Sequence, residues 1–139
     1  MLSHGTDMEE YRENPDWDFS LLPITNNDII LIASLMPKVN VISLKLSNCG
    51  ITDIAALKDS MPNVRDLALC RNQITDISAL KDSMPNVKKL YLYENRITDI
   101  SALRYSLPNV QTLFLGGNNI KFKDALMLRK EFGEQVVIG

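Results

Sequence analysis

The chain has 139 residues, of which 45% are hydrophobic, and this length fits one globular domain with no room for a second. Its formal charge of -2 and the lack of any lysine- and arginine-rich run argue against nucleic-acid binding as the main activity. No segment is long and apolar enough to span a bilayer, and the first residues are polar and acidic, so we expect no membrane partner and a cytoplasmic location.

The N-terminal part of the chain predicts two segments. Residues 1–14 have little to bury and predict a flexible acidic arm. Residues 15–38 predict an N-terminal cap or a degenerate first repeat, which would cover the apolar end of a stack. Trp17, Phe19 and Leu21 alternate like one face of a strand, and the segment NNDIILIASLMP then predicts a helix that ends at Pro37.

Residues 39–120 consist of repeats of about 23 residues. MPNVRDLALCRNQITDISALKDS, from Met61, is followed at once by MPNVKKLYLYENRITDISALRYS, from Met84. A fixed period of this length indicates a stacked architecture. The same register aligns three apolar columns, which are Leu44, Leu67, Leu90 and Leu113; Leu46, Leu69, Leu92 and Leu115; and Ile51, Ile74, Ile97 and Ile120.

Each unit reads V-x-x-L-x-L-x-x-N-x-I-T-D-I-x-x-L, and on this motif the chain is identified as a member of the leucine-rich-repeat proteins. Its I-T-D-I-S-A-L segment resembles the internalins and the leucine-rich-repeat regulatory subunits of protein phosphatase 1. The resemblance implies an α/β solenoid, with a curved parallel β-sheet on the concave face and short helical segments on the convex face. The repeat is one residue longer than is usual in those relatives, which leaves room for a fuller helical turn in the return segment.

The alternation within each repeat predicts parallel strands at residues 42–46, 65–69, 88–92, 111–115 and 136–138. Leucines point inward, and the residues between them face outward on the concave side. Asn72, Asn95 and Asn118 follow the strands, where an amide side chain can bond to buried backbone groups of the turn. Cys49 takes this place in the first repeat, so we predict a structural role for it. Both Cys49 and Cys70 are expected to be reduced.

Short polar residues precede each return segment. Asp53, Asp76 and Asp99 are predicted to accept hydrogen bonds from the free N–H groups at the start of these segments. A calcium-binding column of carboxylates is the alternative, and the capping role explains the residues better, so we predict no metal and no cofactor. Residues 121–139 predict a C-terminal capping helix, KFKDALMLRKEF, with Gly133 just past its end, and then the last strand.

The two most similar repeats differ almost only on or beside the outward side of their strands. Drift of exposed positions is one explanation, but the outer helical surface is exposed too and differs less, so we favour specialisation of the concave face for a partner. Tyr91, Tyr93 and Phe114 are the predicted anchors, although cross-strand pairing could also explain them. Gly116 has no side chain, so a partner group could approach the backbone beside Phe114. The complete predicted partner-binding set is Lys45, Asp66, Ala68, Cys70, Arg71, Lys89, Tyr91, Tyr93, Glu94, Thr112, Phe114 and Gly116.

The sequence gives little support for catalysis, because His4 is the only histidine and no nucleophile elbow or phosphate-binding loop is present. We therefore predict a non-catalytic module, monomeric in solution, that binds another protein. The resemblance implies either a regulatory subunit of a phosphatase-like enzyme or a bacterial or protist effector that acts in the host cytosol. A structural scaffold that self-associates through the sheet edge near residues 136–138 is the alternative from another class.

Overall fold

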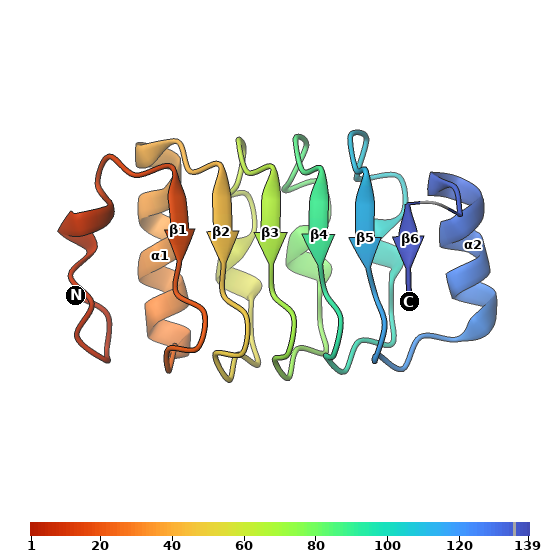
Figure 1. The fold of residues 1–139 in the computed structure, drawn as a ribbon, viewed down its shortest axis with the longest axis horizontal. Helices are drawn as coiled ribbons and strands as arrows, with labels where there is room; N and C mark the ends of the chain where they lie inside the picture. Colours follow the sequence, from red (N-terminus) through yellow and green to blue (C-terminus); the bar gives the residue numbers. More distant parts are fainter. Residues whose placement is uncertain (135) are drawn as a thin grey trace.

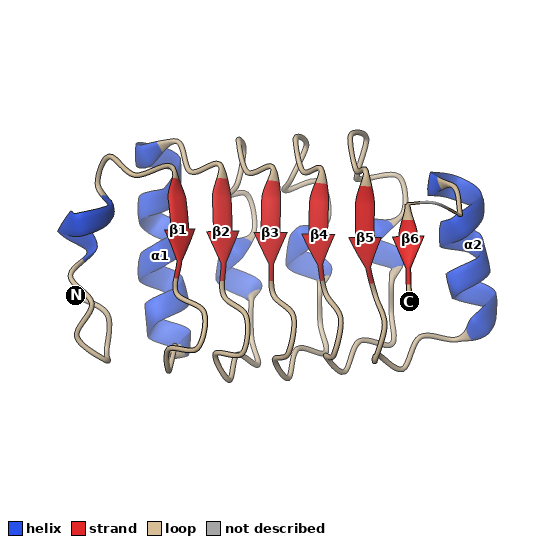
Figure 2. Cartoon of the chain, viewed as in Figure 1, coloured by secondary structure: helices blue, strands red, loops and turns tan. Residues whose placement is uncertain are grey.

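The computed structural model describes residues 1–134 and 136–139. Its central feature is a six-stranded parallel sheet in which the strands follow one another in chain order (Figure 1). Helical segments cover one face of this sheet, and the other face is open (Figure 2). The open face is the one that we expected to be concave, and it is called the concave face below. The strands are β1 (Asp16–Asp18), β2 (Ser43–Lys45), β3 (Asp66–Ala68), β4 (Lys89–Tyr91), β5 (Thr112–Phe114) and β6 (Val137–Ile138).

Two α-helices lie at the ends of the stack; short 3-10 turns lie between them, and another precedes the first helix. The helices are α1 (Asn26–Val39) and α2 (Phe122–Phe132), and the 3-10 turns are η1 (Met8–Tyr11), η2 (Ala55–Leu57), η3 (Ser78–Leu80) and η4 (Ser101–Leu103). Each strand is therefore followed by a segment that returns across the covered face to begin the next strand. This arrangement confirms the predicted repeat solenoid.

The leucine columns form the core. Leu44, Leu67, Leu90 and Leu113 pair in register across β2, β3, β4 and β5, and all four are fully buried. The regular strands are shorter than predicted, but hydrogen bonds continue past them, as where the N–H of Leu46 donates to the carbonyl of Ala68 at 2.9 Å. One continuous hydrophobic core thus runs through the stack, as the sequence period predicts.

Asparagine side chains join each repeat to the one before it. The Oδ1 of Asn72 accepts the N–H groups of Cys49 and Ile51 at 2.9 and 3.0 Å, and its Nδ2 donates to the carbonyls of Leu46 and Leu69 at 2.9 Å. Equivalent bonds are made by the later asparagines of this column, Asn95 and Asn118. These buried groups would otherwise lack partners, so the asparagines stabilise the turns.

Cys49 has the structural role that we predicted. Its thiol donates to the carbonyl of Phe19 at 3.2 Å, and burial raises the pKa of this thiol. Cys49 and Cys70 are both free and buried. The first repeat therefore uses a thiol for its side-chain hydrogen bond to the N-terminal cap. Each later repeat uses an asparagine amide for the corresponding bond to the repeat before it.

The return segments are tighter than we predicted. The expected fuller helical turn is a three-residue 3-10 turn in each repeat, and the backbone then reverses through a left-handed residue, Asp59, Asp82 or Tyr105. A buried serine follows this residue and donates its hydroxyl back to the preceding turn, as Ser83 does to the carbonyl of Ala79 at 2.7 Å. The extra residue of the repeat is thus used in this reversal and not in a longer helix.

Residues 1–14 do not form the flexible arm that we expected. Leu2 and Met8 are buried against the end of the stack. The hydroxyl of Ser3 donates to Asp28 in α1 at 2.6 Å, and the indole of Trp17 donates to the carbonyl of Asn14 at 2.8 Å. The expectation relied on average polarity, and two apolar side chains are enough to dock this short segment on the open end of the core.

The N-terminal cap also differs from the prediction in detail. Trp17 and Phe19 are buried as expected, but Leu21 has a left-handed backbone and is 75% exposed. Helix α1 does not end at Pro37: it continues through two further residues and ends where Asn40 adopts the left-handed conformation. Proline lacks an N–H group but does not forbid the helix from continuing on its exposed side.

At the C-terminal end, α2 packs beside β6 and closes the stack (Figure 1). Leu128 is its fully buried residue, and the N–H of Gly133 donates to the carbonyl of Arg129 at 2.8 Å where the helix ends. Leu113 of β5 pairs in register with Val137 of β6. The elements expected in residues 121–139, a helix followed by a strand, are therefore both present.

Candidate functional site

The parallel pairing places the predicted partner-binding residues in rows that cross the concave face. Lys45, Ala68, Tyr91 and Phe114 occupy matching positions on successive strands. A neighbouring row contains Asp66, Lys89 and Thr112, again in register. Cys70, Tyr93 and Gly116 follow the strands, and backbone hydrogen bonds between the repeats continue through this region.

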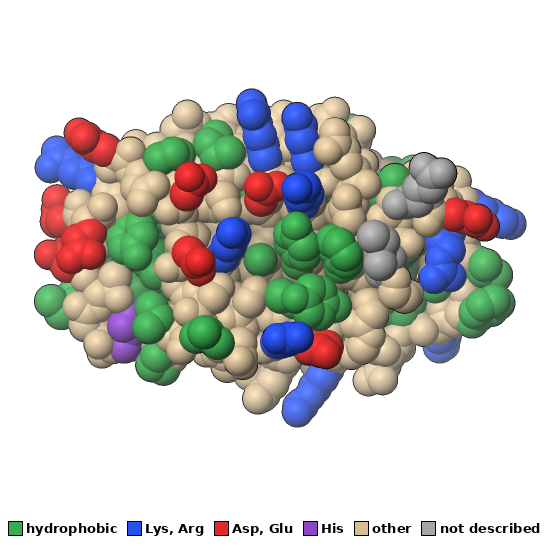
Figure 3. All heavy atoms as spheres, viewed as in Figure 1, with side chains coloured by type: hydrophobic (Ala, Val, Ile, Leu, Met, Phe, Trp, Pro, Cys, Tyr) green, Lys and Arg blue, Asp and Glu red, His purple; other side chains and the backbone are tan. Residues whose placement is uncertain are grey.

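Three aromatic side chains form a cluster in the middle of this face. The rings of Tyr91 and Phe114 are stacked, with centroids 4.9 Å apart and planes 7° apart. Tyr93 meets Phe114 edge to face, with centroids 6.3 Å apart. All three side chains are half-buried, and they form the green patch over β4 and β5 in Figure 3. The sequence predicted this cluster, because alternation and the repeat period alone determine its geometry.

An ion pair borders the aromatic cluster. The Nε of Arg71 lies 2.8 Å from Glu94 Oε2, and the guanidinium lies 5.8 Å from the ring centre of Tyr93. Hydrogen bonding and charge attraction from Glu94 raise the pKa of Arg71. Both residues have left-handed backbones, with φ of 56°. Non-glycine residues adopt this conformation at a cost, and such positions often occur at functional sites.

Ala68 and Cys70 were predicted to contact a partner, and both are less exposed than that prediction expects. Ala68 is 9% exposed and Cys70 is 5% exposed, although both point to the concave side. Ala68 lies in register between the longer side chains of Lys45 and Tyr91, and Cys70 lies 2.9 Å from the hydroxyl of Ser47. Ala68 therefore lies next to Tyr91, and Cys70 lies next to Tyr93, beneath the exposed surface of the aromatic cluster.

Cys70 affects the ionisation of Tyr93. A hydrogen bond with Cys70 is the main cause of a raised pKa for the Tyr93 phenol, and the nearby Cys70 sulfur adds to the effect. The phenol is therefore held in its neutral form over a wider pH range than a free tyrosine. A neutral hydroxyl remains available as a donor or acceptor at the edge of the cluster.

The remaining predicted residues surround the cluster with mixed charge. Lys45 and Lys89 are exposed, and Asp66 and Thr112 are half-buried. Gly116 does not offer the open backbone that we expected. The last residue, Gly139, packs against it so closely that a Cβ on Gly139 would lie 2.4 Å from the nitrogen of Gly116.

The sequence analysis missed a hollow over β1, β2 and β3 on the concave face. It has a volume of about 280 Å³ and is lined by Asp16, Trp17, Asp18, Ser43, Lys45 and Asp66. Its carboxylates come from β1 and β3, which the sheet places on either side of β2. The alternation of Asp16 and Asp18 around the buried Trp17 is the sequence signal from which this hollow could have been found.

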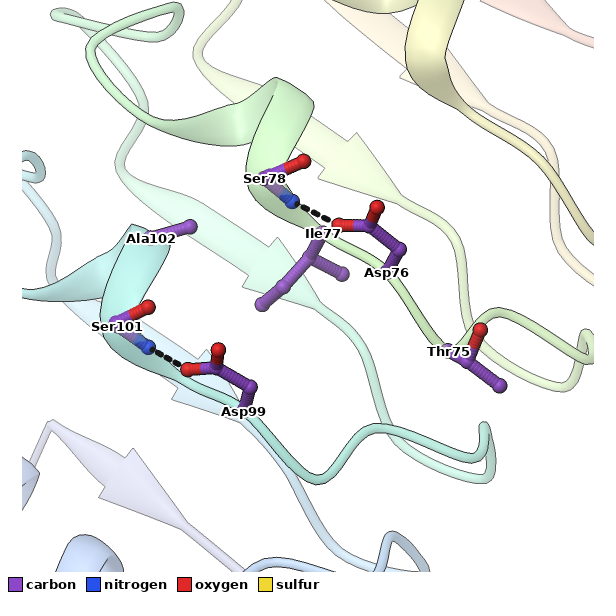
Figure 4. A pocket seen from close by; sticks show the side chains of 7 residues that line it. All are labelled: Thr75, Asp76, Ile77, Ser78, Asp99, Ser101 and Ala102. Atoms are coloured by element: carbon purple, nitrogen blue, oxygen red, sulfur yellow. Dashed lines mark hydrogen bonds between the residues drawn. The ribbon is translucent and has the colours of Figure 1, made fainter.

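A second hollow lies in the return segments, away from the concave face. Its volume is about 290 Å³, and Figure 4 shows Asp76 and Asp99 at its margin. Both carboxylates accept backbone N–H groups, Asp76 from Ser78 at 2.8 Å and Asp99 from Ser101 at 2.9 Å. These hydrogen bonds lower the pKa of both aspartates. The geometry agrees with the predicted capping role.

Within residues 1–134 and 136–139, no three histidine, cysteine or acidic residues are grouped so that they could hold a metal ion. Over the same residues, no helix has the length and apolar character needed to cross a membrane. The ring of His4, in the segment before η1, bonds to the hydroxyl of Thr6.

The fold and the open sheet face define a class of repeat proteins whose members are generally non-catalytic and commonly bind other proteins. The family model for leucine-rich repeats in two copies matches residues 39–82 and 85–126. The chain therefore belongs to the leucine-rich-repeat family. No curated protein matches the chain.

Two solved structures show the same architecture, and both are internalins of Listeria monocytogenes. An internalin (inlF) is 29% identical over 75% of this chain and 33% of its own, with a TM-score of 0.56. Internalin C2 is 24% identical over 84% of this chain and 59% of its own, with a TM-score of 0.53. The chain thus spans about a third of the first structure and less than two thirds of the second. The predicted resemblance to internalins is confirmed at the level of the repeat fold.

Proposed function

We propose that the chain is a non-catalytic module that binds a partner protein on its concave face. The observation that carries this proposal is the aromatic cluster of Tyr91, Tyr93 and Phe114, which lies on a sheet face that no helix covers. Aromatic side chains next to an arginine are typical of the residues that contribute most to protein interfaces.

The surroundings of the cluster determine what the partner must offer. Arg71 and Glu94 already pair with each other, so a partner that approaches the cluster meets a nearly neutral rim on that side. Lys89 and Asp66 lie in register on the other side and add charges of both signs. We therefore expect the partner to contribute an apolar side chain at the centre and polar groups of both signs around it.

The experiment is a pull-down from lysate with the chain and with its Tyr91→Ala/Tyr93→Ala/Phe114→Ala variant as bait, followed by mass spectrometry. A protein captured by the wild type and lost with the variant would identify the partner and the site. Tyr105→Ala is the matched control, because Tyr105 is an exposed aromatic residue outside the concave face. Circular dichroism of each bait checks that the fold is intact, and equal capture by all three baits would refute the proposal.

The partner could be a phosphatase-like enzyme or a host protein bound by an effector in the host cytosol, and the similarity to two Listeria internalins favours the second. Self-association through the β6 edge is a weaker alternative, because α2 packs beside β6 at that end of the sheet. Capture of a phosphatase by the wild type, lost with the triple variant, would overturn the preference for an effector.

A further inference from the structure

The C-terminal end of the solenoid presents an apolar surface that no other part of the described chain covers. Helix α2 buries Leu128 and turns Phe122, Leu126 and Met127 outward, where they are 74%, 40% and 40% exposed. Phe122 and Leu126 are four residues apart and lie on the same side of the helix. Exposed apolar side chains that lie together on one helix are typical of a contact site.

The outward side of α2 is also basic. Lys123 and Lys130 are exposed among the apolar residues of this helix. On the other side, Glu131 accepts the Nε of Arg104 at 2.6 Å, so this carboxylate is engaged within the fold. The surface that α2 presents to a partner therefore combines apolar side chains with the positive charges of Lys123 and Lys130, and Asp124 of the same helix is half-buried.

The opposite end of the solenoid contains an apolar groove. It has a volume of about 410 Å³ and lies between η1 and α1. Its apolar lining comes from Met8, Trp17, Leu35 and Val39, and its charged lining from Glu9, Arg12, Glu13 and Lys38. A groove of this volume is large enough to receive an aromatic side chain.

The N-terminal end carries the charge that complements α2. Asp7, Glu9, Glu10 and Glu13 lie in or beside η1, against Arg12, which lies 3.7 Å from Glu9, and Lys38, which also lines the groove. Figure 3 shows mainly acidic side chains at the η1 end, and mainly basic and hydrophobic side chains, with some acidic atoms, at the α2 end. The two ends of one molecule are thus complementary in both polarity and charge.

We propose that a second copy of this chain docks head to tail, with α2 of one copy against the η1–α1 groove of the next. Phe122 enters the groove, and Lys123 and Lys130 face the carboxylates of Glu9 and Glu13. The two surfaces are different and lie at opposite ends of the molecule (Figure 1), so the contact is heterologous and each added copy presents a free surface at either end. The expected assembly is a linear series of solenoids.

The test uses one variant for each surface. Phe122→Asp disables α2, and Glu9→Lys/Glu13→Lys disables the groove; all three side chains are exposed, so the fold is expected to survive. By analytical ultracentrifugation, the average mass of the wild type should rise with concentration above the 15.7 kDa of one chain. Each variant alone should stay at that mass. An equimolar mixture should form a dimer and nothing larger, because each variant retains one intact surface.

Leu21→Asp is the matched control, since Leu21 is as exposed as Phe122 and lies on neither surface. This variant should associate like the wild type, and added salt should weaken the association by screening the charged contacts. A wild type that remains monomeric at every concentration would overturn the proposal. So would self-association of the groove variant on its own, which would indicate a symmetric contact between two α2 helices.

Discussion

Asn72 and Cys49 are joined across a repeat boundary, with the side-chain oxygen of Asn72 accepting the backbone N–H of Cys49 at 2.9 Å. The same oxygen accepts the N–H of Ile51 at 3.0 Å. Neither N–H group can reach water, so the turn that leaves the strand relies on a side chain of the following repeat. The stability of one repeat therefore depends on a single amide in the next.

We expect Asn72→Ala to lower the free energy of unfolding by about 3 kcal/mol, because it leaves buried donors and acceptors without partners. Chemical denaturation followed by circular dichroism measures the change. Asn63→Ala is the control, since Asn63 is exposed, and it should change stability by less than about 0.5 kcal/mol. Equal effects of the two substitutions would contradict the assigned role of the asparagine column.

Tyr93 is expected to protect the thiol of Cys70. Removing the ring in Tyr93→Ala should raise the rate at which Cys70 reacts with a thiol reagent on the order of tenfold, because thiol reactivity follows exposure. The rate is read by absorbance during labelling of the native protein, and mass spectrometry identifies the modified cysteine. Tyr93→Phe keeps the ring and should react slowly, like the wild type. Fast labelling of Cys70 in the wild type would show that the thiol is not covered.

Asp28 should make stability depend on pH in acid. Burial pushes the pKa of Asp28 up, but hydrogen bonds from Ser3 and Thr25 outweigh it and the pKa is lowered. A carboxyl group with a lowered pKa in the folded state stabilises the fold above its unfolded value, at about pH 4, and this contribution is lost as the pH falls through the lowered value.

Asp28→Asn should therefore cost about 1 to 2 kcal/mol at neutral pH. Its difference from the wild type should shrink as the pH is lowered, because a protonated aspartate and an asparagine are both neutral. Urea denaturation over a series of pH values measures both effects. A difference that stays constant into acid would show that the Asp28 carboxylate is not the group responsible.

Substitutions at Arg71 and Glu94 should change affinity for a partner without changing the stability of the fold. Both have left-handed backbones, which asparagine tolerates well, and Asn48 already has this conformation at the equivalent place in the first repeat. The double substitution Arg71→Asn/Glu94→Asn should change stability by less than about 1 kcal/mol, since exposed ion pairs contribute little. We expect affinity for the captured partner to fall at least about tenfold. Unchanged affinity in calorimetry would remove this pair from the site.

The core and the aromatic cluster could be predicted because both depend only on the spacing of residues. A period of 23 residues with strict alternation places Leu67 beside Leu90, and Tyr91 beside Phe114, on adjacent strands. This holds whatever other residues the chain contains. The asparagine column follows from the same register. These features needed no knowledge of how large the neighbouring side chains are or how they are oriented.

The features that could not be predicted depend on contacts between side chains of different sizes or on segments outside the repeat. Cys70 points outward yet is buried, because Tyr93 and Ser47 happen to cover it. Leu2 lies in a polar segment, and only the open end of the core explains why it is buried. The position of Gly139 against Gly116 likewise depends on β6, which pairs with β5 outside the repeated sequence.

The asparagine column gives the stack a direction. Each amide bonds backward, to the repeat that precedes it in the chain, as Asn95 donates to the carbonyl of Leu69 at 2.9 Å. The asparagine of a newly synthesised repeat can therefore make its bonds as soon as it emerges, because its partners have already been made. The turn N–H groups of that repeat wait for the asparagine of the next one. Duplication of one 23-residue unit would likewise supply both halves of every junction, so such a chain can lengthen by whole repeats without redesign of either end.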